Sequence, residues 1–183
     1  MRLLVVKSPS FSKCDRVREV VRRFDGVVIL CGDLSQCYEL LQDVKGRRVV
    51  GTPSLYSDVF EIKMLKSLGA LCMGRWIDVG EAVVGCIDAL NPVQCLEMLA
   101  RASKAGEPRI LVSTQRLRTP RKAGWPSAEE LCSLLGTFTV IDCCGEQGAA
   151  VHRLPRCTIV EVGCSLALIE MMGGEVEAVC VEI

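Results

Sequence analysis

The chain has 183 residues, half of them hydrophobic but only 4% aromatic, so its core must be built mainly from aliphatic side chains and cysteine. This length and composition suit a single domain, residues 1–183, of the α/β class. Basic and acidic residues both total 22, and the net charge of zero excludes a global affinity for nucleic acid or an anionic membrane. No segment reaches the roughly eighteen apolar residues that cross a bilayer, and the first apolar stretch is too short for a signal peptide. We therefore expect a soluble, cytoplasmic protein without a membrane contact.

Apolar runs and helical spacings predict the following elements in chain order. Strands and helices first alternate as strand 2–6, helix 13–24, strand 27–31, helix 36–41, strand 47–50 and helix 57–68. The second part contains a hairpin of strands 75–79 and 82–87, helix 93–105, strand 109–113, a helix capped by Ser127, and strand 138–141. The chain closes with strands 158–162, 166–171 and 176–182. Two stacked β-sheets (a β-sandwich) flanked by helices explain these closing strands, whereas a doubly wound sheet does not.

Twelve cysteines are unusual in a chain of this length. No Cys-x-x-Cys pair occurs and His152 is the only histidine, so zinc-ligand spacing is absent. We expect most cysteines to be small buried apolar residues, because Cys31 and Cys86 lie in strand-like runs. The alternative is a set of intracellular disulfides of the kind that hyperthermophiles use, and the even count permits it. In that case the adjacent Cys143 and Cys144 would pair with other cysteines rather than with each other.

Several predicted strands end in short polar motifs. These motifs are Ser8-Pro9-Ser10, Gly32-Asp33, Gly51-Thr52-Pro53-Ser54, Ser113-Thr114 and Gly145-Glu146-Gln147-Gly148. Ligands bind at the carboxyl ends of strands in open α/β sheets, so the carboxylate of Asp33 is placed where chemistry is expected.

The order and spacing of these motifs resemble the calcineurin-like metallophosphoesterase family, in particular its small phosphodiesterases. The resemblance implies two stacked sheets with helices outside, and a two-metal site built from the loops at the strand ends. The family's Gly-Asp motif is present as Gly32-Asp33, whose carboxylate corresponds to the metal-bridging aspartate. The segments "VEVGCSLAL" and "GALCMGRWIDVGEAVVGCI" also resemble parts of the family pattern.

The remaining metal-site positions of the family differ in this sequence. The family has an Asp-x-His motif, an Asn-His pair, a single His, and a Gly-His-x-His motif. The matching positions are occupied here, in that order, by Ser8 and Ser10, Thr52 and Pro53, Thr114, and Glu146 and Gly148. The resemblance therefore identifies the chain as a degenerate member, a pseudoenzyme in which most of the metal ligands are missing.

Two-metal hydrolysis needs cations about 3.5–4 Å apart, and several carboxylates and imidazoles must hold such mutually repelling ions together. Hydroxyls and a proline ring cannot do so, and we expect no resident cofactor. A single Mg²⁺ or Mn²⁺ could still bind through Asp33 together with substrate phosphates, since Mg²⁺ often uses one or two carboxylates. The alternative role of Asp33 is to accept hydrogen bonds from loop amides. We expect His152 to be an ordinary surface residue.

The loop "TQRLRTPRK" contains four cations within seven residues, namely Arg116, Arg118, Arg121 and Lys122. In the resembled fold this loop borders the metal cleft, so fixed guanidinium groups could bind a phosphate or a nucleic-acid backbone. The alternative is an ordinary solvated loop. We expect Trp76 to be buried in the core and Trp125 to be exposed.

Three functional hypotheses follow. The first is a non-catalytic metallophosphoesterase-fold domain that serves as a binding or scaffold module for a protein partner; the retromer scaffold subunit and the small subunits of some replicative polymerases look like precedents. The second is a divergent phosphodiesterase or phosphatase that uses Asp33, with Glu146, and a divalent metal. The third is an unrelated α/β anion-binding domain.

Overall fold

The computed structural model of the chain describes residues 1–102, 108–119 and 124–183, whose strands form two sheets. The first sheet has the order β11-β10-β1-β2-β3, with β1 at Arg2–Lys7, β2 at Val27–Cys31, β3 at Val49–Thr52, β10 at Leu166–Met172 and β11 at Glu175–Cys180. The second has the order β4-β5-β6-β7-β9-β8, with β4 at Trp76–Asp78, β5 at Val83–Ile87, β6 at Arg109–Ser113, β7 at Thr139–Asp142, β8 at Ala149–Arg153 and β9 at Thr158–Val162. The two sheets are stacked, as the sequence predicts.

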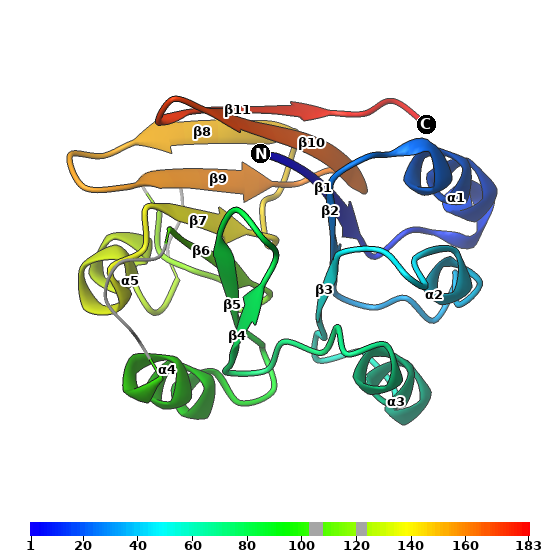
Figure 1. Cartoon of the computed structure of the whole chain (residues 1–183), viewed down its shortest axis with the longest axis horizontal. Helices are drawn as coiled ribbons and strands as arrows, with labels where there is room; N and C mark the ends of the chain where they lie inside the picture. The colour runs from blue at the N-terminus through cyan, green and yellow to red at the C-terminus, as the bar shows by residue number, and fades with distance from the viewer. Residues whose placement is uncertain (103–107, 120–123) are drawn as a thin grey trace.

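Helices cover the outer faces of both sheets (Figure 1). On the side of the first sheet lie α1 (Cys14–Arg23), α2 (Leu40–Asp43) and α3 (Val59–Ser67). On the side of the second lie α4 (Pro92–Arg101) and α5 (Ala128–Leu135), and a short 3₁₀ helix, η1 (Phe11–Lys13), precedes α1. No helix in the described ranges is long and apolar enough to cross a membrane.

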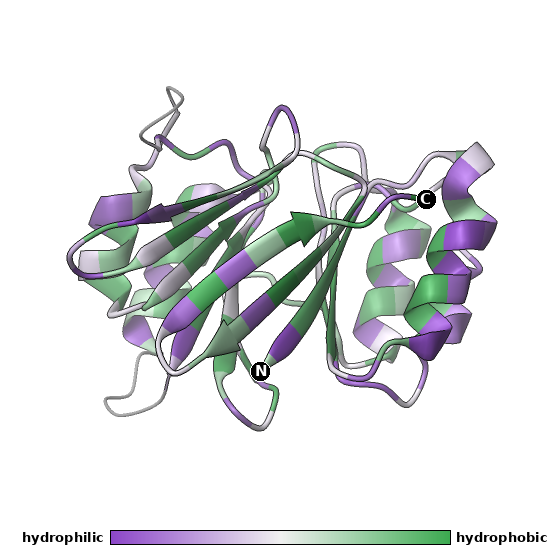
Figure 2. Cartoon of the chain, turned by 90° about the horizontal axis from the view of Figure 1, so that it is seen from above, coloured by the Kyte–Doolittle hydropathy of each residue, from purple (hydrophilic) through white to green (hydrophobic). Residues whose placement is uncertain are grey.

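The core consists of three apolar clusters, one between the sheets and one between each sheet and its helices. Alternation along β1 shows how a strand serves two of them: Leu3 and Val5 point into the layer between the sheets, whereas Leu4 and Val6 face α1 and α2. The central strands are therefore apolar on both faces, which explains their continuous hydrophobic runs in the sequence. Figure 2 shows these apolar strands at the centre and polar residues on the helices.

Most of the expected elements are present, with shifted ends. The strands predicted at 27–31, 109–113 and 158–162 have the predicted limits. The helix predicted at 36–41 is wrong, because residues 36–39 form turns and α2 begins only at Leu40. The last part of the helix predicted at 93–105 falls on residues 103–107, which lie outside the described residues.

The strand β8 was missed by the sequence analysis. Its residues lack an apolar run, and it is held by antiparallel pairing with β9, which aligns His152 with Ile159. His152 is consequently not an ordinary surface residue: its ring is mostly buried, with Nε2 3.2 Å from Oε1 of Glu161. Trp76 is only partly buried, because it lies on β4 at the edge of the second sheet. Its ring contacts Gly85, and its Nε1 donates to the Leu99 carbonyl (3.1 Å).

Most cysteines are buried, as expected, but they do not act merely as small apolar residues, because most of them are paired. Ten of the twelve form five disulfides, with Cα–Cα distances from 5.4 to 6.5 Å: Cys14–Cys37, Cys31–Cys143, Cys72–Cys86, Cys132–Cys157 and Cys164–Cys180. These separations lie within the range that disulfides span, and they depend on tertiary contacts that a sequence does not display. Cys143 does pair with a distant cysteine rather than with Cys144, as anticipated for the alternative.

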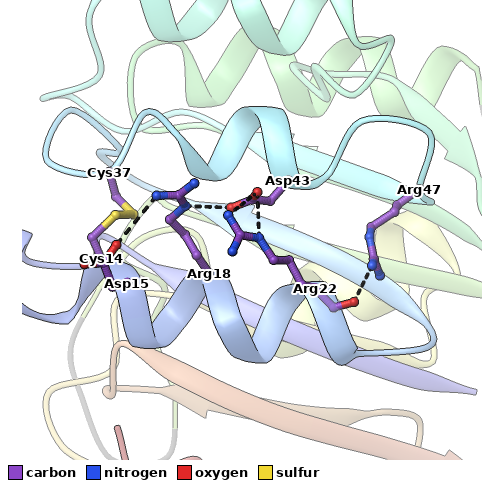
Figure 3. Close-up of polar contacts among 7 residues, drawn as sticks. All are labelled: Cys14, Asp15, Arg18, Arg22, Cys37, Asp43 and Arg47. Carbon is purple, nitrogen blue, oxygen red and sulfur yellow. Dashed lines mark hydrogen bonds and ion pairs between the residues drawn. A yellow bond between two sulfur atoms is a disulfide. The ribbon is translucent and has the colours of Figure 1, made fainter.

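Charged contacts join α1 to α2, and a disulfide joins α1 to the segment before α2 (Figure 3). Arg18 Nε donates to Asp43 Oδ2 (2.7 Å), Arg22 Nε donates to Oδ1 (2.9 Å), and Arg47 Nη1 donates to the Phe24 carbonyl (2.7 Å) at the end of α1. Burial alone would raise the pKa of Asp43, but the hydrogen bonds from the two guanidinium groups outweigh it and lower that pKa. Together with the Cys14–Cys37 disulfide, these contacts hold the segment between β2 and α2 in place.

Candidate functional site

A cavity of about 530 Å³ lies where the carboxyl ends of both sheets meet. Strands β1, β2 and β3 run parallel to one another, as do β5, β6 and β7, so the loops that follow them gather at one edge of the sandwich. The lining residues come from these loops and are Lys7, Ser8, Cys31, Gly32, Ser54, Leu55, Tyr56, Ala89, Thr114, Gln115, Arg116, Cys143 and Cys144.

The loops after β1 and β2 interlock through Ser8 and Gly32. Ser8 has a left-handed backbone with φ 37°, and its Oγ accepts a hydrogen bond from the Asp33 amide (3.0 Å). A Cβ at Gly32 would lie only 2.4 Å from that Oγ, so glycine is required there. Ser8, which the resemblance predicted to stand at a metal-ligand position, therefore has a hydroxyl that positions the neighbouring loop.

Asp33 also makes a local structural contact. Its Oδ1 accepts from the Ser35 amide at 2.8 Å, and the side chain is not among those that line the cavity. This contact matches the alternative in which the carboxylate accepts hydrogen bonds from loop amides. Asp33 thus shapes the turn after β2.

Glu61 on α3 is a buried carboxylate that the sequence analysis missed. It accepts from the Leu34 amide (3.0 Å) and from Ser57 Oγ (2.9 Å), while the same hydroxyl lies 3.0 Å from the Gly32 carbonyl. Burial raises the pKa of Glu61 to about 7 despite these two hydrogen bonds, and the nearby charge of Asp33 adds to the rise. The hydrogen bonds of Glu61 therefore hold the loop between β2 and α2 in place. The sequence pattern of the helix does not indicate that this glutamate is buried.

The positions Thr52, Pro53 and Thr114 form part of the packing between the sheets. Thr114 Oγ1 donates to the Pro53 carbonyl at 2.7 Å, which ties the loop after β6 to the loop after β3. Thr52 is 1% exposed, and its hydroxyl has no hydrogen-bond partner in the part of the chain that the structure describes. These hydroxyl groups are neutral, and that of Thr114 is engaged in a contact within the chain.

Three sulfur atoms and an ammonium group occupy the inner wall of the cavity. The disulfide Cys31–Cys143 joins the end of β2 to the residue after β7, and the Cys144 thiol donates to the Thr114 carbonyl (3.1 Å). Lys7 Nζ donates to the carbonyls of Gly145 (2.9 Å) and Val162 (3.2 Å). Covalent and backbone contacts thus connect the two sheets at this wall.

The cationic loop is only partly gathered at the cavity. Arg116 lines it and forms an ion pair with Glu146 (2.8 Å), whereas Arg118 pairs with Glu130 on α5 (3.4 Å). Arg121 and Lys122 lie outside the described residues. Trp125 is 54% exposed, as predicted.

Two of the predicted positions lie away from the cavity. Ser10 is exposed, with its Oγ 3.2 Å from that of Ser12. Gly148 has a positive φ of 63°, and its carbonyl accepts from the Gly163 amide (2.7 Å) in the turn before β8. The loops that carry Ser8, Asp33, Thr52, Pro53, Thr114 and Glu146 do converge around the cavity through the contacts described above.

Comparison with known proteins rests on structure, because no protein-family model and no curated protein sequence match this chain. The structure of TT1561 from Thermus thermophilus aligns with a TM-score of 0.74 at 10% identity over 99% of both chains. The fold is metallophosphoesterase-like. Purple acid phosphatase PPD1 from yellow lupin aligns at 0.57 and 8% identity over 91% of this chain and 44% of its own. Chaetomium thermophilum Vps29 aligns at 0.53 and 9% identity over 94% of this chain and 86% of its own.

The residues of this cavity do not fit the two-metal centre that the fold family implies. Within residues 1–102, 108–119 and 124–183, no three His, Cys, Asp or Glu side chains are grouped so that they could hold a metal ion. The candidate donors have other contacts: Asp33 accepts from Ser35, and Glu146 pairs with Arg116. Neutral hydroxyls and a disulfide cannot offset the repulsion between two divalent cations about 4 Å apart.

Proposed function

We propose that this chain is a non-catalytic metallophosphoesterase-fold domain that acts as a binding or scaffold module for a protein partner. The observation that carries the proposal is the donor set at the strand ends, where Ser8, Thr52, Pro53 and Thr114 stand at former ligand positions. The Cys31–Cys143 disulfide links the two sheets covalently at this edge. The similarity to Vps29 supports the fold on which the proposal rests.

A phosphate or nucleic-acid ligand is the less favoured contact. At Arg116 an anion would compete with the carboxylate of Glu146, and Arg118 faces a different carboxylate on α5. Binding of a protein partner does not require either of these ion pairs to break. We therefore place the protein partner first and keep the anion as an outcome to be measured.

The disulfides restrict the cellular compartments in which the proposed module would act. Five disulfides suit either an oxidising compartment or the cytoplasm of a hyperthermophile, where intracellular disulfides are common. A cytoplasmic location, as we propose from the sequence, therefore implies a thermophilic source.

A phosphodiesterase assay tests the proposal. The purified protein is incubated with bis-p-nitrophenyl phosphate and excess Mn²⁺ or Mg²⁺, beside its Asp33→Ala variant. We expect product formation at the background rate in both samples. Metal-dependent turnover that disappears in Asp33→Ala would replace the scaffold role with that of a divergent phosphodiesterase.

A further inference from the structure

Beside the cavity, the chain exposes a cluster of large apolar side chains that we name the α3 surface. It consists of Leu55, Tyr56, Val59 and Phe60, which are 62%, 81%, 67% and 53% exposed. Four such side chains within six residues form a patch rather than the scattered exposed apolar groups that are normal on a protein. Because Leu55 and Tyr56 also line the cavity, the patch and the cavity are continuous.

The first turn of α3 exposes its apolar side chains and buries its charged one, the reverse of the usual pattern. Val59 and Phe60 face solvent, whereas the carboxylate of Glu61 is fully buried. A helix that only had to cover the sheet would bury the apolar residues and expose the glutamate. The reversal indicates that these apolar side chains are displayed for contact with another molecule.

The α3 surface is presented on a well-held segment. Asp58 caps α3 by accepting from the Glu61 amide (2.8 Å), and Ser54 Oγ accepts from the Tyr56 amide (3.2 Å). The ring of Phe60 lies edge-on to that of Tyr38, with centroids 5.0 Å apart. The loss of conformational entropy on binding is smaller for side chains that are already held in this way.

The border of this surface at the N-terminus of α3 carries the carboxylates of Asp58 and Asp33. The Tyr38 hydroxyl donates to Asp58, and the charges of Asp58 and Asp33 help to raise the pKa of Tyr38 to about 12. Asp58 is thus in contact with Tyr38, and Asp33 lies between Gly32 and Leu34, which bond to Ser57 and Glu61 at the start of α3. The cations on α3 are Lys63 and Lys66, both exposed and further along the helix, and Lys7 and Arg116 line the adjoining cavity. A basic side chain of a partner complements the border formed by Asp33 and Asp58.

We propose that the α3 surface docks a segment of a partner protein that presents apolar anchor side chains beside lysine or arginine. The apolar anchors cover Tyr56 and Phe60, and the basic side chains pair with Asp33 and Asp58. This inference rests on the proposed binding function and names the kind of partner that it requires.

Binding of a synthetic amphipathic peptide of leucine and lysine, measured by fluorescence anisotropy, tests the proposal on the full chain. The variant Tyr56→Ser/Phe60→Ser is compared with Met172→Ser/Val179→Ser, which removes two exposed apolar side chains from β10 and β11. We expect the first variant to bind at least about tenfold more weakly and the second to bind like the unmodified protein. Asp33→Asn, which keeps the acceptor for Ser35, should weaken binding about two- to fivefold at low salt.

Other results would overturn the proposal. These are equal binding of a leucine and glutamate peptide, equal loss in the β10 and β11 variant, or absence of peptide binding. Sedimentation that shows self-association lost in Tyr56→Ser/Phe60→Ser would assign the surface to a second copy, and binding to phosphatidylcholine–phosphatidylserine vesicles would assign it to a membrane. If a native partner is captured equally by the unmodified protein and by Tyr56→Ser/Phe60→Ser, the scaffold role stands while the location on α3 is wrong.

Discussion

Cys31 and Cys143 are 112 residues apart in the sequence and form a disulfide between the end of β2 and the residue after β7. The two cysteines are 0% and 3% exposed, and both line the cavity between the sheets. Since β2 belongs to the first sheet and β7 to the second, this disulfide closes the sandwich at the edge where the cavity lies.

Removing this disulfide should destabilise the chain more than removing a short-range one. The Cys164–Cys180 disulfide spans only 16 residues. Loop-closure entropy predicts that Cys31→Ala/Cys143→Ala lowers the free energy of unfolding by about 1.7 kcal/mol more than Cys164→Ala/Cys180→Ala does. Urea denaturation of both variants measures the difference, and equal midpoints would contradict the role of the disulfide in tying the sheets together.

The layers of the fold could be predicted because strands buried on both faces leave a continuous apolar signature. Val27–Cys31 and Arg109–Ser113 are such strands, and the polar residues after them correctly indicated a shared edge. The strand β8 could not be predicted in this way, because its side chains are partly or fully exposed and it lies at the edge of its sheet, paired with β9.

The side-chain contacts of the site were harder to predict from the sequence than the fold. The hydroxyl residues at Ser8 and Thr114 were visible in the sequence, but the hydrogen bonds that engage them join loops far apart in the chain. The same holds for the disulfide partners, because spacing along the chain does not determine which cysteines meet. The burial of Glu61 follows from the position of Leu34 and Ser57 around it, and neither residue marks that contact in the sequence.

The number and reactivity of the thiols can be measured directly. We expect the denatured, unreduced chain to take up two iodoacetamide groups, at Cys95 and Cys144, because the other ten cysteines form disulfides. In the native protein Cys95 should react far more slowly than Cys144, since it is buried. That burial and the hydrogen bond to Asp88 raise the pKa of Cys95 to about 12. Peptide mass spectrometry locates the label, and labelling at Cys31 or Cys143 would contradict the assignment.

The contact between α1 and α2 predicts a stability effect at Asp43. Asp43→Asn removes the charge that two guanidinium groups share, and we expect the free energy of unfolding to fall by about 1–2 kcal/mol at neutral pH. The pKa of Asp43 is lower in the folded state, so this stabilisation is present above the unfolded pKa and is lost as the pH falls through the folded one. Glu19→Gln, which disrupts the exposed pair with Arg23, is the control and should change stability by less than about 0.5 kcal/mol. A similar effect for both variants would mean that Asp43 adds nothing beyond an exposed pair.

Glu61 should give the chain an unusual loss of stability as the pH rises from acidic to neutral values. Its folded pKa is about 7, whereas the unfolded value is near 4.5, so between these values the folded state holds a proton that the unfolded state has released. The free energy of unfolding should therefore fall across this interval, by on the order of 3 kcal/mol at most.

Glu61→Gln should remove this dependence, because the amide is neutral at every pH and can still accept from the Leu34 amide and bond to Ser57. Urea denaturation at pH 4.5, 5.5 and 7 compares this variant with the unmodified chain and with Glu97→Gln, an exposed glutamate on α4 paired with Arg101. We expect a flatter profile for Glu61→Gln alone. A proton retained by Glu61 in the folded state must appear in the pH dependence of folding. If the free energy of unfolding of the unmodified chain does not fall with pH, or falls equally in Glu61→Gln, the buried carboxylate does not have the role in the loop beside the cavity that we assign to it.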